Sequence, residues 1–235
     1  MAVESGLEAA EFDLAVTPLR ELNAALHAID EGSPRHWRVL NPRGAHALAV
    51  GIDAPVEVEI EGHAGYYCAG MNKQATVRVH GNVGVGCAEN IMSGAVIVDG
   101  DASQSVGATG RGGLVVIRGN AAARCGISMK GVDIVVQGSV GHMSGFLAQK
   151  GTLVICGDAG EALGDSIYEA HVYVRGRVAD LGADCVEKEM GDEHVDELAT
   201  LLERAEADGV SPGEFRRYGS ARKLYNFHVD NAGEY

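Results

Sequence analysis

Short segments of alternating character recur along the middle of the chain, and each of them ends at a glycine. Aliphatic residues stand four and two positions before the glycine, with a more variable residue between them. Because side chains two apart on a β-strand point to the same face, the pattern predicts short strands with one aliphatic, inward face. The column four positions before the glycine holds Val58, Val77, Val96, Val115, Ile134, Leu153 and Val172.

The glycines that end these segments are 19 residues apart, without insertion or deletion, and they are Gly62, Gly81, Gly100, Gly119, Gly138, Gly157 and Gly176. A unit of this length is too short for a helix, a strand and two loops, but it fits one coil of a β-solenoid. Leucine-rich repeats and calcium-binding nonapeptide rolls are excluded, because their consensus residues are absent. We therefore predict an all-β fold, a right-handed single-stranded parallel β-helix of about seven coils, spanning residues 54–190.

Helical extensions are expected at both ends, because a solenoid must cover its open ends. Residues 1–53 would hold a helix and irregular strands that lead into the first coil. That helix is predicted to start at Thr17 and Pro18 and to stop at Gly32, with an apolar stripe of Leu19, Leu22, Leu26 and Ile29. Residues 191–235 would hold a second helix, capped by Asp192 and stopped at Gly209, and a tail that folds back on it or docks on a neighbour.

Charge and composition narrow the possible partners. The chain of 235 residues is 46% hydrophobic and carries a formal net charge of −14. This balance argues against nucleic acid and against an anionic membrane, since both attract basic patches. No apolar stretch is long enough for a transmembrane helix. Five cysteines without a CxxC motif indicate reduced thiols and a cytoplasmic location.

Candidate chemistry is sparse. Cys68, Cys87 and Cys125 each follow a repeat glycine by six residues and so share one column, which suits small core residues better than a zinc site. The histidines fall at different phases of the repeat, and the G-x-G matches do not lie in a βαβ unit. We expect no catalytic residue and no cofactor or metal site in this chain.

Two outward columns indicate contacts. Three residues before each glycine stand Glu59 and Arg78, then the four aliphatic residues Ile97, Val116, Val135 and Val154, and then Tyr173; these last five are called here the aliphatic strip. Four coils of outward aliphatic residues should be covered, either by the chain's own terminal helix or by a partner subunit. The second column, eleven residues after the glycine, is a basic edge of Lys73, Arg111 and Lys130, with Lys150 one step off the column; it is either a solvated edge or a site for an acidic partner or an anion.

Several segments carry a resemblance to a known family. They are residues 62–73 (GHAGYYCAGMNK), 86–100, 105–119, 124–151, 162–176 (ALGDSIYEAHVYVRG) and the tail 221–235 (ARKLYNFHVDNAGEY). They resemble the GXGXG β-helix domain of the glutamate synthase large subunit. Residues 162–176 and the tail look like its stand-alone form, the β-helix subunit of N-methylglutamate synthases (methylamine–glutamate N-methyltransferase). The resemblance covers roughly residues 13–235.

The resemblance implies a structural subunit without catalytic residues. One partner would be an FMN-binding glutamate-synthase-like subunit with an iron–sulfur cluster, and the other would resemble class II glutamine amidotransferases. The assembled enzyme would make N-methylglutamate from glutamate and methylamine and release ammonia. The β-helix subunit of formylmethanofuran dehydrogenase shares the repeat but less of the tail. A related three-subunit complex, a free-standing binding module or a metal protein using the cysteine column remain alternatives.

Overall fold

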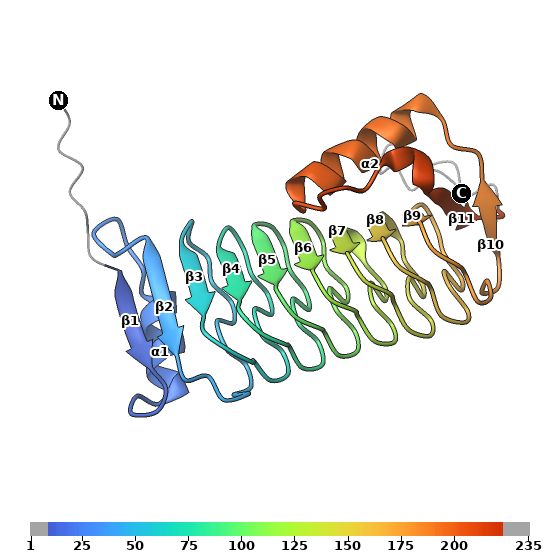
Figure 1. The fold of residues 1–235 in the computed structure, drawn as a ribbon. Coiled ribbons are helices and arrows are strands. Elements are labelled where there is room, and N and C mark those ends of the chain that lie inside the picture. The colour runs from blue at the N-terminus through green and yellow to red at the C-terminus, as the bar shows by residue number, and fades with distance from the viewer. Residues whose placement is uncertain (1–8, 223–235) are drawn as a thin grey trace, which may run out of the picture.

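One sheet of eleven strands runs the length of the molecule in the computed structural model, which describes residues 9–222 (Figure 1). Strands β1 to β9 follow one another in chain order and are parallel, whereas β11 is antiparallel and lies between β9 and β10. The strands are β1 (Ala10–Asp13), β2 (His36–Leu40), β3 (Glu57–Ile60), β4 (Thr76–Val79), β5 (Ala95–Val98), β6 (Leu114–Ile117), β7 (Lys130–Val136), β8 (Lys150–Ile155), β9 (His171–Val174), β10 (Cys185–Lys188) and β11 (Arg216–Ser220).

Strand register follows the 19-residue period. Val58 is paired with Val77, which is one coil further on, and Val77 with Val96 in turn. Both inward positions of each strand from β3 to β9 are buried, as the alternation predicts. A second line of isolated bridges joins Ala64 to Val83 and continues, one bridge per coil, to Val178. The predicted β-solenoid of about seven coils is therefore confirmed.

The repeat glycines stack directly on one another. The Gly119 N–H donates to the Gly100 carbonyl at 3.1 Å, and the same bond recurs along the column up to Gly176. A Cβ on Gly119 would lie 2.8 Å from the Gly100 oxygen, so close approach of the backbones excludes any side chain here. Positive φ is not the reason in this column, because only Gly62 adopts it.

A polar ladder, absent from the sequence analysis, accompanies the glycine stack. From Gly62 to Gly157, the side chain of the residue after each repeat glycine accepts a hydrogen bond from the backbone N–H of its counterpart on the next coil. The Asp101 N–H donates to Asn82 Oδ1 at 2.9 Å, and the Asn120 N–H to Asp101 Oδ1 at 2.7 Å. The ladder consists of His63, Asn82, Asp101, Asn120, Ser139, Asp158 and Arg177. Side chains thus satisfy backbone donors at a corner where the sheet hydrogen bonds end.

The N-terminal end is closed by a short helix, α1 (Leu19–His27), whose Leu22 and Leu26 are buried in the main core. The helix begins one residue after Pro18 and ends well before Gly32, so both predicted ends were too generous. Ile29 keeps the helical spacing but follows the helix, because Asp30, Gly32 and Ser33 form a turn held by side-chain hydrogen bonds.

Residues 36–51 are more regular than predicted. Strand β2 pairs in parallel with β3, with Trp37 opposite Val58. The loop after β2 donates backbone hydrogen bonds to the next coil, including that from Gly51 to the Gly70 carbonyl at 2.8 Å. These residues therefore form a further turn of the solenoid ahead of the glycine repeat.

The C-terminal part folds back over the outer face of the sheet. Helix α2 (Asp192–Arg204) starts after Gly191, whose N–H donates to His194 Nδ1, and ends five residues before the predicted stop at Gly209. A 3₁₀ turn, η1 (Pro212–Glu214), then leads into β11. Arg216 and Arg217 lie in β11, and Arg222, just after it, is paired with Asp184, while the tail from Lys223 onward lies outside the described residues.

Candidate functional site

The five cysteines are buried and free of disulfide bonds. Cys68, Cys87 and Cys125 point into the main core, where burial raises the pKa of the Cys68 and Cys125 thiols to about 12. The pKa of Cys87 is raised as well, by burial and by its neighbour Cys68. These thiols are protonated at neutral pH and have no access to a substrate, so they are packing groups rather than nucleophiles.

The outward aliphatic strip is covered by the chain itself. Val116, Val135, Val154 and Tyr173 are buried in a second apolar cluster, separate from the main core, with Leu198, Leu201 and Leu202 of α2 and Phe215 after η1. Ile97, at the end of the strip, is only partly buried. Of the two alternatives for this strip, the structure contains the one in which the terminal helix covers it. These residues therefore do not form a free partner face.

A polar cluster fixes the edge of α2 against the sheet. Glu197 lies 2.9 Å from His171 Nδ1 and 2.5 Å from the Tyr173 hydroxyl, and it accepts a longer hydrogen bond of 3.3 Å from Thr152. Burial raises the pKa of Glu197, but these hydrogen bonds outweigh burial and lower the pKa to about 2. Burial and the adjacent carboxylate raise the pKa of Tyr173 far above its usual range. Both groups therefore hold α2 in place with fixed protonation states.

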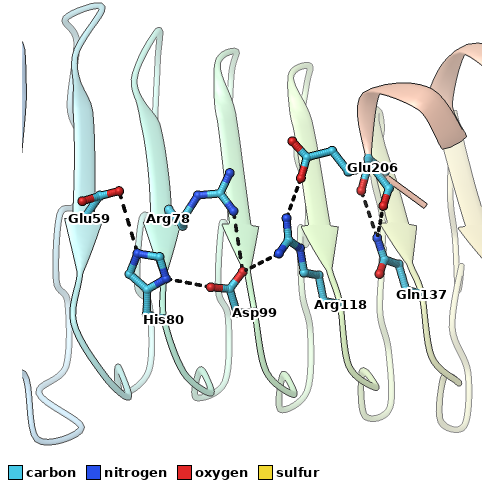
Figure 2. A network of polar contacts seen from close by, with 8 residues as sticks. Glu59, Arg78, His80, Asp99, Arg118, Gln137 and Glu206 are labelled. Carbon is cyan, nitrogen blue, oxygen red and sulfur yellow. Dashed lines mark hydrogen bonds and ion pairs between the residues drawn. The ribbon is translucent and has the colours of Figure 1, made fainter. Parts of the chain in front are cut away.

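A charged row occupies the part of the outward face that α2 leaves uncovered (Figure 2). Asp99 lies 2.7 Å from His80 Nδ1, 3.3 Å from Arg118 and 3.6 Å from Arg78. Arg118 continues the row to Glu206, just after α2, at 2.6 Å. This row joins the exposed strands to the end of the covering helix. It was recoverable from the sequence, because His80, Asp99 and Arg118 share the position just before the repeat glycine.

Arg111, Lys130 and Lys150 of the predicted basic edge lie exposed on three consecutive coils, and Lys73 lies exposed two coils before Arg111. Lys130 of β7 and Lys150 of β8 are partners in the strand register. The Lys130 N–H donates a hydrogen bond to the carbonyl of Gly110, the residue before Arg111. Lys73 pairs with Asp53 at 2.7 Å, whereas Arg111, Lys130 and Lys150 are exposed and have no ion pair within residues 9–222. These three unpaired cations lie on neighbouring coils, whose strands are about 4.8 Å apart. They therefore concentrate positive charge on an acidic protein.

Hollows in the surface lie beside the helices. One of about 340 Å³ opens between α1 and the first coils and is lined by Leu26, Ile29 and Met71. Another, of about 400 Å³, lies beside α2 and is lined by Asp133, Glu197 and Arg204. In the part of the chain that the structure describes, no hydrogen bond joins a thiol or an aliphatic hydroxyl to a histidine, so neither hollow contains an activated nucleophile.

Comparison with known proteins gives one strong relative. The chain is 65% identical over 224 residues to protein GlxC of Rhizobium meliloti (strain 1021), which covers 95% of this chain and 98% of the relative. No family model matches the chain. Within residues 9–222, no helix is both long and apolar enough to cross a membrane.

Proposed function

Because the chain belongs to the family of protein GlxC, we propose that it is a non-catalytic structural subunit of a heteromeric, glutamate-synthase-like enzyme. The observation that carries this proposal is the placement of the reactive groups. The thiols are buried with raised pKa values, and His80 and His171 are held by the carboxylates of Asp99 and Glu197 at 2.7 and 2.9 Å. A rod built in this way offers surfaces rather than an active centre.

We further propose that the complex is an N-methylglutamate synthase, in which glutamate and methylamine give N-methylglutamate and ammonia. This step rests on the resemblance of the coils and of the tail to the stand-alone GXGXG subunits. The partners would be an FMN-binding glutamate-synthase-like subunit with an iron–sulfur cluster and a class II glutamine-amidotransferase-like subunit. The reaction chemistry would take place on those partners, and this chain would hold them together in the cytoplasm.

Purification of the tagged chain from its native cell tests both levels of the proposal. We expect mass spectrometry to identify the two partner subunits and the flavin absorption to follow the complex rather than the isolated chain. Turnover by the isolated chain as a monomer would overturn the structural role. A complex of this composition that forms no N-methylglutamate from glutamate and methylamine would overturn the finer assignment and leave the structural role standing.

The basic edge is the surface we propose for an acidic segment of a partner subunit. Arg111, Lys130 and Lys150 have no intramolecular ion pair among residues 9–222, and Met92 stands exposed in the same column on the preceding coil. A line of cations beside a flexible apolar side chain suits a partner segment that combines carboxylates with apolar residues. The strip under α2 is no longer available for this role.

Charge reversal tests this surface. The triple variant R111E/K130E/K150E should reduce recovery of partner subunits at least tenfold, and the binding of the unaltered chain should weaken as salt concentration rises. Arg124→Glu is the matched control, because Arg124 is exposed in the same coil as Lys130 but lies outside the basic edge. Equal recovery with the triple variant, at equal melting temperature, would refute the docking surface.

A further inference from the structure

Three metal-ligand side chains meet on the uncovered outer face of β3 and β4. Glu59 lies in β3, Glu61 directly follows it, and His80 directly follows β4. One ligand atom from each residue lies within 4.8 Å of the other two. One imidazole nitrogen and two carboxylates form a donor set that divalent transition metals bind. We propose that these three residues form a binding site for a divalent transition-metal cation, called here the β3–β4 site.

The Asp99 carboxylate, which lies outside the site, determines which His80 nitrogen points into the site. Asp99 forms ion pairs with Arg78 and Arg118, and its carboxylate acts as an acceptor. It lies 2.7 Å from His80 Nδ1, which must therefore carry the proton and donate it. The neutral ring then turns an Nε2 lone pair away from Asp99. A carboxylate that orients an imidazole in this way is the usual support of a metal-binding histidine.

The lone pair faces Glu59. His80 Nε2 is 3.9 Å from Glu59 Oε1, which is too long for a hydrogen bond, and Figure 2 shows the ring edge turned toward this carboxylate. Metal–ligand distances of about 2.1 Å place two tetrahedral ligands about 3.4 Å apart, so a closure of about 0.5 Å brings this pair into range. A neutral His80 leaves this contact without a hydrogen, and a bound cation would remove the resulting repulsion.

The third ligand keeps a free oxygen. Arg38 Nε engages Glu61 through Oε1 at 2.8 Å, which leaves Oε2 for a metal. The side chains of Glu59, Glu61 and His80 are 52%, 31% and 33% exposed, so water can reach the site and complete the coordination.

Calorimetric titration of the chelator-treated full chain with Zn²⁺ tests the proposal. His80→Ala and Glu59→Gln should each weaken binding at least tenfold. Asp99→Asn should weaken it about 10–100-fold, because it loosens the support of His80. Glu57→Gln is the matched control: Glu57 lies on the same face of β3 but pairs with His36 at 2.9 Å, and its loss should leave the affinity unchanged.

Two results would overturn the site. One is the absence of Zn²⁺ binding up to millimolar concentration, and the other is an unchanged affinity in both His80→Ala and Glu59→Gln, which would place the metal elsewhere. Glu59 is more than half exposed, so its variant should fold even where the His80 variant does not, and circular dichroism checks both. No partner subunit is needed, so the outcome is independent of the proposed structural role.

Discussion

Truncation of one leucine tests whether α2 is a separate unit docked on the solenoid. Leu198 is fully buried, and it packs in the apolar cluster that lies outside the main core. A helix of 13 residues is marginal by itself in water, so α2 depends on this contact. Leu198→Ala removes three carbons and leaves a cavity, a change that costs about 2–5 kcal/mol.

We take about 3 kcal/mol as the expected loss of docking free energy. Since each 1.4 kcal/mol corresponds to about a factor of ten, the amides of α2 should exchange with deuterium roughly 100-fold faster. The strands β3 and β4 pack only in the main core, and their protection should stay unchanged. Hydrogen exchange measured by mass spectrometry reports both regions in one experiment.

Leu153→Ala is the matched control for this prediction. Leu153 is also fully buried, but it points into the solenoid core from β8, so its truncation should lower the protection of the coils themselves. The reasoning fails if Leu198→Ala loosens β3 and β4 as much as it loosens α2. In that case the helix and the coils would unfold as one cooperative unit.

Three further outcomes follow from the same contacts. The pKa of Glu197 is lowered to about 2, so its contribution to the free energy of unfolding is complete above pH 4.5. About 1–2 kcal/mol of that free energy, after allowance for solvent screening, should be lost as pH falls toward 2. Glu197→Gln should flatten this acid part of a series of denaturation curves measured at different pH. Gly119→Ala places a Cβ 2.8 Å from the Gly100 oxygen and should cost more than about 2 kcal/mol by chemical denaturation, against almost nothing for Gly32→Ala. Thiol reagents should label Cys125 only after unfolding, and rapid labelling at neutral pH would contradict its burial.

The coils were predictable because a solenoid is nearly one-dimensional. Each position contacts its own copy 19 residues away, so the columns of the sequence are already the contacts of the structure. The inward valines and the stacked glycines follow directly from that rule. The columns also contain the charged row, because His80 precedes Asp99 by one period. A comparison of the histidines only with one another does not reveal this row.

The repeat does not predict which part of the molecule covers the aliphatic strip. An aliphatic column at Val116 and Val135 shows that something must cover it, but the choice depends on where the chain turns after the last coil. Strand β11 decides it by inserting between β9 and β10, which ties both ends of the C-terminal segment to the rod. Such a return is a long-range contact with no counterpart one period away. The ends of α1 were missed for the opposite reason, because a local turn overrides the spacing of Ile29.

The polar ladder explains why the period is so strict. The ladder begins at His63 and ends at the Arg177 N–H, and the 19-residue glycine spacing holds over the same span, from Gly62 to Gly176. Outside it the spacing changes, since Val39 pairs with Ile60 21 residues later and Leu163 bridges to Leu181 18 residues later. An added residue inside the ladder would move a short side chain away from the N–H that it accepts and would leave a backbone donor unpaired. The constant length of the coils is therefore the condition for satisfying one backbone group per coil.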